Sequence, residues 1–106
     1  MARANDILEI IHSDVCGPFK EMARGGFYYF ITFIDELSRY GHLFLMKNKS
    51  ESFEKFKEFK AKIENQTGKS IKTLQSDRGR EYLSSKFLTY LEENKILSQW
   101  TPLGTP

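Results

Sequence analysis

Two strand-like runs of residues, 8–14 and 71–77, each end in an aspartate. The first run is apolar and β-branched before it reaches Asp14, and the second does the same before Asp77 and then turns at Gly79. Strands that lie side by side and end in carboxylates offer the oxygen ligands that hard divalent cations need. Two such cations close together are how many enzymes act on phosphodiester bonds. Asp14 and Asp77 are therefore the candidate catalytic and metal-binding residues.

The strand pattern places these acids in a mixed sheet. Apolar and β-branched composition predicts strands over 7–15, 27–34, 40–46, 70–76 and 96–101. The first of these has few polar breaks, which is typical of a strand buried on both faces. Residues 27–46 form a predicted hairpin, with a short polar turn at 35–39.

Between the third and fourth predicted strands, the spacing of apolar residues is helical. Phe53, Phe56, Phe59 and Ile63 form one apolar stripe, which predicts a helix over 50–66 with Gly68 just beyond its end. A second helix is predicted over 84–95. The resulting order, βββαβαβ, is an α/β fold with a mixed five-stranded sheet.

Composition narrows the functional classes. The chain has 106 residues, a net charge of +2 and 40% hydrophobic residues, which allows one packed domain but does not by itself indicate nucleic-acid binding. Its single cysteine, Cys16, excludes an internal disulfide and a cysteine-rich zinc site. The longest apolar run, 27–34, is too short to span a membrane, and residues 1–6 contain no apolar core of signal-peptide length. We expect a soluble, intracellular protein, in the nucleus or cytoplasm, without membrane association.

Several blocks of the sequence together resemble a known family. The order and spacing of these blocks resemble the integrase catalytic core of copia-type long-terminal-repeat retrotransposons. The blocks are residues 8–18, 29–35, 38–40, 53–68 and 76–82. That resemblance implies a ribonuclease H-like fold, DNA as a partner, and DNA integration by metal-dependent strand transfer. It also implies that Asp14 and Asp77 are two acids of a D-D-E site that holds Mg²⁺ or Mn²⁺.

The resemblance also predicts a glutamate near position 113, which lies beyond residue 106. We therefore expect residues 7–106 to be a partial, C-terminally incomplete catalytic core, preceded by an N-terminal extension at 1–6. Metal binding by these residues alone should be weak or absent, and the isolated chain should be inactive. Self-association is expected if the sheet keeps an apolar face open.

Other readings of the same residues remain. The two aspartates could simply cap backbone donors at strand ends, and the chain could be a non-enzymatic nucleic-acid-binding or interaction fragment. A ribonuclease H-type nuclease is a third reading. Glu81 could substitute for the distant glutamate, but a structural role is favoured. Arg80 replaces a glycine usual in the family, a change that would shift the turn after Asp77.

The remaining polar candidates have ordinary structural explanations. His12 shares a strand face with Asp14, yet a packed, hydrogen-bonded histidine is the favoured reading. His42 has no partner at motif spacing, and Cys16 is interpreted as a small buried hydrophobe. Lysines at 47, 49 and along the first helix could meet phosphates, but interspersed glutamates favour a solvated charged face.

Overall fold

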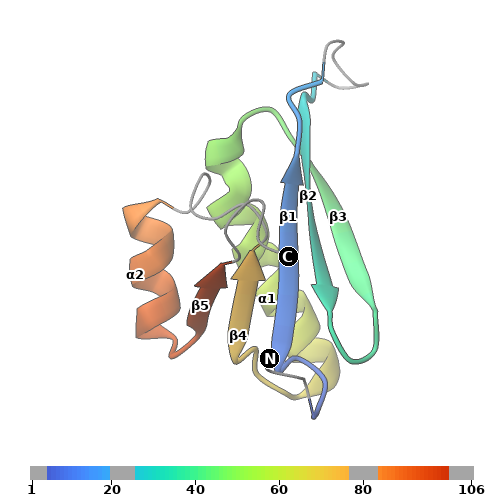
Figure 1. Ribbon diagram of the computed structural model, residues 1–106, viewed down its shortest axis with the longest axis vertical. Helices are drawn as coiled ribbons and strands as arrows, with labels where there is room; N and C mark the ends of the chain where they lie inside the picture. Colours follow the sequence, from blue (N-terminus) through green and yellow to red (C-terminus); the bar gives the residue numbers. More distant parts are fainter. Residues whose placement is uncertain (1–4, 20–25, 77–83, 101–106) are drawn as a thin grey trace.

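The computed structural model describes residues 5–19, 26–76 and 84–100. Within these ranges the chain forms β1 (Ile10–Cys16), β2 (Tyr29–Asp35), β3 (Gly41–Met46), the 3₁₀ turn η1 (Lys49–Glu51), α1 (Ser52–Thr67), β4 (Thr73–Ser76), α2 (Ser85–Glu93) and β5 (Leu97–Trp100). The strands make one sheet in the order β3-β2-β1-β4-β5 (Figure 1). The predicted α/β fold and element order are confirmed.

The sheet mixes two kinds of pairing, as the sequence predicts. β1, β2 and β3 are antiparallel neighbours, whereas β1 pairs with β4, and β4 with β5, in parallel. Each parallel crossover contains a helix, as parallel pairing requires. β1 is therefore held by hydrogen bonds along both edges, which makes it a rigid support for the side chains it carries.

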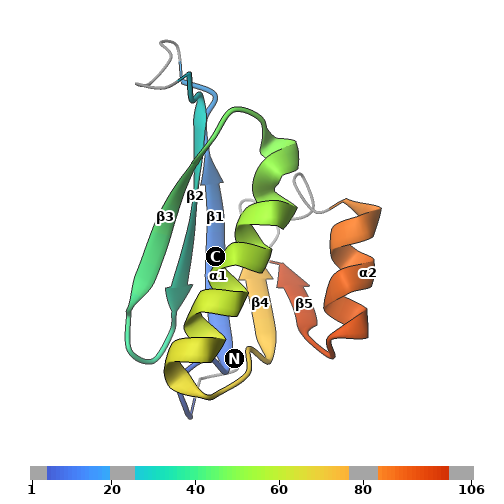
Figure 2. The ribbon, with the colours of Figure 1, turned by 180° about the vertical axis from the view of Figure 1, so that it is seen from behind.

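Both helices pack on the same face of the sheet, which we call the helix face. Figure 2 shows α1 lying across the strands with α2 beside it. The Phe33 ring of β2 stacks on Phe59, with ring centroids 5.0 Å apart, and also meets Phe56 of α1. Phe53 stacks on Phe87 of α2 at 5.2 Å. The predicted apolar stripe of the first helix is thus the centre of the core.

The opposite face of the sheet carries no helix among the described residues. We call it the open face; register places on it the alternate side chains Ile10, His12, Asp14, Cys16, Phe30, Thr32, Ile34, Leu43, Leu45 and Leu97. Leu43 is 55% exposed and Leu97 65%. On this face Ile10 is buried, whereas His12, Asp14 and Cys16 are half-buried. The expectation that the first strand is buried on both faces therefore holds only at its start, because both helices of the described chain lie on one side.

The first strand begins three residues later than predicted because the chain bends at Leu8. This buried residue has a positive φ of 64°. Its amide donates to Oδ1 of Asp35 at 2.6 Å, while the amide of Ser38 donates to Oδ2 at 2.8 Å. Asp35 is 2% exposed, so the predicted polar turn begins with a buried carboxylate that joins the β2–β3 turn to the start of β1.

The helix ends and the fourth strand are set by local hydrogen bonds. The carboxylate of Glu51 accepts from the amides of Lys47 and Asn48, each at 2.8 Å, before α1. Gly68 ends α1 with a φ of 72°, as predicted. The amide of Ile71 donates to the Glu64 carboxylate, and β4 starts only at residue 73. No helix in the described part of the chain is long and apolar enough to cross a membrane.

Candidate active site

Asp14 lies near the carboxyl end of β1, on the open face. It pairs with Thr32 of β2 on one side, and Ser13 before it pairs with Ser76 of β4 on the other. The next residue in the chain after Ser76 is Asp77, which lies outside the described residues. Arg80 and Glu81 lie outside them as well. The described site therefore contains one of the two predicted acids.

The two carboxylate oxygens of Asp14 differ in their surroundings. Oδ1 is buried and has no hydrogen-bond partner among the described residues. Oδ2 accepts a hydrogen bond from Sγ of Cys16 at 3.8 Å. A buried carboxylate oxygen without a partner is costly, and nearly all such atoms in proteins are satisfied. A hard divalent cation is the partner that carboxylate oxygens hold best, so Asp14 fits a metal ligand.

The described part of the chain does not complete a three-residue metal cluster at Asp14. Among residues 5–19, 26–76 and 84–100, no three His, Cys, Asp or Glu side chains come together as a metal cluster. A metal centre at Asp14 with three such side chains would need at least one of them from outside these ranges, and Asp77 is the predicted one.

Cys16 is the residue at this site that sequence reasoning misjudged. It is half-buried rather than fully buried, and it lies beside Asp14 on the open face. The alternation of β1 already placed both side chains on one face, because they are two residues apart. The expectation of a small buried hydrophobe holds only in part, since the open face has no covering helix among the described residues.

His12 is engaged in a local pair, in agreement with its structural reading. Its Nε2 lies 2.9 Å from Oε1 of Glu36, and both side chains are partly exposed. The pair joins β1 to the residue that follows β2. His12 shares the open face with Asp14, as predicted, and its observed contact is with Glu36.

His42 lies on the helix face, away from Asp14. Its ring contacts Tyr40, Phe44 and Phe59. Burial, with a smaller contribution from Lys62, lowers the pKa of His42 below its usual value. Its Nδ1 is buried without a hydrogen-bond partner among the described residues. These aromatic neighbours place His42 at the edge of the hydrophobic core.

The lysines of α1 are mostly paired with glutamates on the same helix. Lys57 meets Glu54 at 2.8 Å and Lys60 meets Glu64 at 2.9 Å. The Lys57–Glu54 pair is exposed, and such pairs contribute little, about 0–1 kcal/mol, whereas the Lys60–Glu64 pair is partly buried. The helix surface is therefore a mixed charged face, as the interspersed glutamates indicated.

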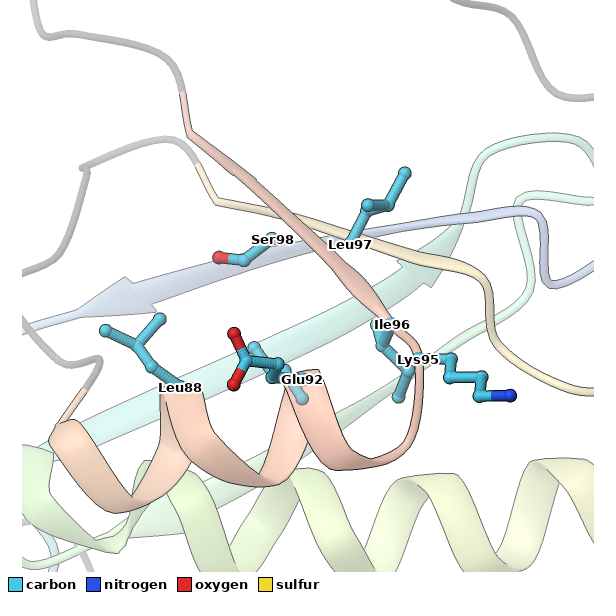
Figure 3. Close-up of a pocket in the computed structure, with 7 residues that line it drawn as sticks. Leu88, Glu92, Lys95, Ile96, Leu97 and Ser98 are labelled. Atoms are coloured by element: carbon cyan, nitrogen blue, oxygen red, sulfur yellow. The ribbon is translucent and has the colours of Figure 1, made fainter.

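An apolar groove lies at the β5 edge of the sheet, between α2 and β5 (Figure 3). It has a volume of about 460 Å³, and its lining includes Leu88, Leu91 and Ile96, with Glu92 and Lys95 as its charged members. It contains neither Asp14 nor a histidine or cysteine. Its chemistry gives no reason to place a reaction there.

Comparisons with known proteins agree with the fold and the motif blocks. A family model described as the integrase core domain matches residues 5–106. The retrovirus-related Pol polyprotein from transposon TNT 1-94 of Nicotiana tabacum is 41% identical over 104 residues, which is 98% of this chain and 8% of that protein. The transposon Ty1-NL2 Gag-Pol polyprotein of Saccharomyces cerevisiae is 30% identical over 95 residues, covering 88% of this chain and 5% of the relative. The chain thus spans less than a tenth of these relatives.

Solved structures show the same fold at low sequence identity. The integrase catalytic core domain of HTLV-2, solved with magnesium, matches 92% of this chain and 62% of its own with a TM-score of 0.64 and 19% identity. A simian T-cell lymphotropic virus intasome, in complex with the PP2A regulatory subunit B56 gamma, matches 94% of this chain and 34% of its own with a TM-score of 0.69 and 16% identity. The ribonuclease H-like fold is confirmed. With the family model and the transposon relatives, these results show that the chain belongs to the integrase core domain family, among copia-type retrotransposon integrases.

Proposed function

We propose that this chain takes part in DNA integration as the portion of an integrase core that carries Asp14 and Asp77 as metal ligands. The observation that carries the proposal is the buried, unpartnered Oδ1 of Asp14 at the end of a strand held on both sides. The parallel pairing of Ser13 with Ser76 supports a shared ion, because each of these serines is followed in the sequence by an aspartate. A related fold has been solved with magnesium.

The residues of this chain would contribute by holding a metal ion and by orienting the carboxylate that binds it. A bound Mg²⁺ or Mn²⁺ would stabilise the attacking and leaving oxygens of an in-line displacement at a DNA phosphodiester. Asp14 would present Oδ1 from a strand that cannot shift easily, since β1 is paired along both edges. The contact from Cys16 to Oδ2 would restrict rotation of the same carboxylate.

Activity should need more than these 106 residues. The family resemblance implies a third acid near position 113, so a polypeptide of residues 1–106 would supply two acids of a three-acid site. Mg²⁺ bound by one or two carboxylates keeps several waters and is held loosely. We expect such a polypeptide to bind Mn²⁺ weakly and to leave labelled duplex DNA uncut and unjoined.

The direct test is calorimetric titration of the chain with Mn²⁺. The unchanged chain should bind weakly, and Asp14→Asn and Asp77→Asn should each abolish binding. Asp6→Asn is the matched control, because Asp6 is an exposed carboxylate already paired with Lys69 at 2.8 Å. Submicromolar affinity, or binding unaffected by Asp14→Asn, would contradict the proposal. Metal-dependent nicking that Asp77→Asn abolishes would show that two acids suffice, whereas DNA binding without metal binding would favour the non-enzymatic reading.

A further inference from the structure

An aromatic pair lies on the open face beside the candidate metal ligand. The ring of Phe19, which follows β1, stacks on Phe30 of β2 with centroids 5.7 Å apart and planes inclined by 22°. Phe19 is 41% exposed, so one of the largest apolar side chains of the molecule stays in contact with solvent. A single exposed phenylalanine needs no explanation, but a stacked pair in which one ring stays exposed forms a flat apolar surface.

The register of β1 and β2 fixes how close this pair is to Asp14. Phe30 is directly opposite Cys16, and Asp14 is directly opposite Thr32. Phe30 and Asp14 are therefore diagonal neighbours on the same face, a relation that spans about 7–8 Å between antiparallel strands. The amide of Phe19 donates to the carbonyl of Tyr28 at 3.0 Å, which ties the residue after β1 to the start of the hairpin. The pair is thus anchored close to the carboxylate.

The open face combines aromatic and aliphatic side chains around Asp14. Thr32 and Leu43 lie in the same row across the sheet as Asp14, and Phe30 and Leu45 lie in the neighbouring open-face row. The Phe19 ring stacks on Phe30 in that second row. A flat, uncharged ring without hydrogen-bonding groups suits the face of a nucleobase, which stacks on aromatic side chains with little regard to sequence. An aliphatic surface lacks this match. The stacked pair, rather than the neighbouring leucines, is therefore the part of this surface that suits a base beside a phosphodiester held at Asp14.

We propose that Phe19 and Phe30 form a stacking platform for an unpaired base of the DNA substrate, next to the phosphodiester held at Asp14. The inference rests on the proposed function, and it adds a substrate class: DNA with at least one unstacked nucleotide beside the reacting phosphate. A base inside a duplex is already stacked and must be freed at a cost of a few kcal/mol. The platform therefore favours DNA ends with unpaired nucleotides over blunt duplexes.

The test compares two DNA probes on the full 106-residue chain. One is a duplex with a three-nucleotide unpaired 3′ end, and the other has abasic residues at those three positions. We expect about tenfold tighter binding, by fluorescence anisotropy, to the probe with bases, because one stacked base contributes about that factor. Phe19→Ala should remove the preference, and Phe19→Trp should keep it. Tyr40→Ala is the matched control, since Tyr40 is a similarly exposed aromatic at the far end of the hairpin.

A second measurement keeps the result independent of folding defects. The fluorescence of Phe19→Trp, after subtraction of the signal that the unchanged chain gives from its single tryptophan under the same conditions, should fall on binding the probe with bases and stay unchanged with the abasic probe. Circular dichroism should show that Phe19→Ala retains its fold. Asp14→Asn should lose Mn²⁺ binding but keep the base preference, which separates this inference from the metal proposal. A base preference that survives Phe19→Ala, or its absence in the unchanged chain, would overturn the inference.

Discussion

The two faces of one sheet are used differently in this chain. On the helix face, Phe33, Phe56 and Phe59 are at most 1% exposed and hold the sheet and α1 together. On the open face, alternate residues of the same strands include Asp14 and the exposed Leu43 and Leu45. Because side chains alternate along a strand, one backbone supplies a stable core to one face and a partly exposed surface that carries Asp14 to the other.

The largest expected effect is on the helix face. Phe33→Ala should lower the free energy of unfolding by about 3–5 kcal/mol, because it removes a buried ring packed between α1 and the sheet. Leu43→Ala on the open face should change it by no more than about 0.5 kcal/mol. Urea unfolding followed by circular dichroism measures both. If Phe33→Ala does not fold, Phe33→Leu provides a milder substitution, with an expected loss under about 1.5 kcal/mol. Equal losses of unfolding free energy in Phe33→Ala and Leu43→Ala would contradict the difference between the helix face and the open face.

The second prediction concerns association through the open face. Exposed apolar side chains that form a continuous patch favour self-association, so the chain should self-associate or bind an extrinsic hydrophobic dye. The double variant Leu43→Lys, Leu45→Lys should lose most of that signal. The double variant Ala61→Lys, Gln66→Lys adds the same charge to exposed positions of α1 and should not. A monodisperse monomer that binds no dye would contradict this account of the face.

The smallest expected effect is a pH dependence from His42. Its pKa is lowered in the folded chain, chiefly by burial and further by Lys62, so the unfolded chain binds a proton more readily. The contribution of neutral His42 to the free energy of unfolding should therefore be fully present above about pH 6.5, the pKa of His42 in the unfolded chain. It should decline as the pH falls toward the pKa of His42 in the folded chain. His42→Phe should lose less stability than the unchanged chain between pH 7.5 and pH 5.5. An NMR titration of the His42 ring with a midpoint above 6.5 would contradict the prediction.

Sequence alone predicted the architecture because periodicity and turn residues are local signals. The stripe at Phe53, Phe56, Phe59 and Ile63 and the glycine at 68 determine α1 without reference to the rest of the chain. Burial was harder, because it depends on where the helices pack. The first strand was expected to be covered on both faces, yet both helices lie on one side.

The role of Asp14 as a metal ligand stays a prediction from the strand that ends in an acid and from the motif blocks. Its contact with Cys16 depends on side-chain placement on the open face. The burial of Asp35 depends on two backbone amides, one of them from a residue 27 positions away in the chain. The stacking of Phe19 on Phe30 likewise needs the β1–β2 register, which composition does not specify. Asp77 stays a prediction, since it lies outside the described residues.

The most direct test of the central claim is the effect of Mn²⁺ on the amide signals of the isotopically labelled chain. Paramagnetic broadening should be greatest at Asp14, Cys16, Thr32 and Ser76, around the carboxyl end of β1. It should be slight along the acidic positions of α1, and Asp14→Asn should abolish it. Broadening centred on α1 or near Asp6, or broadening that persists in Asp14→Asn, would contradict the assignment of the open face as the metal-binding face.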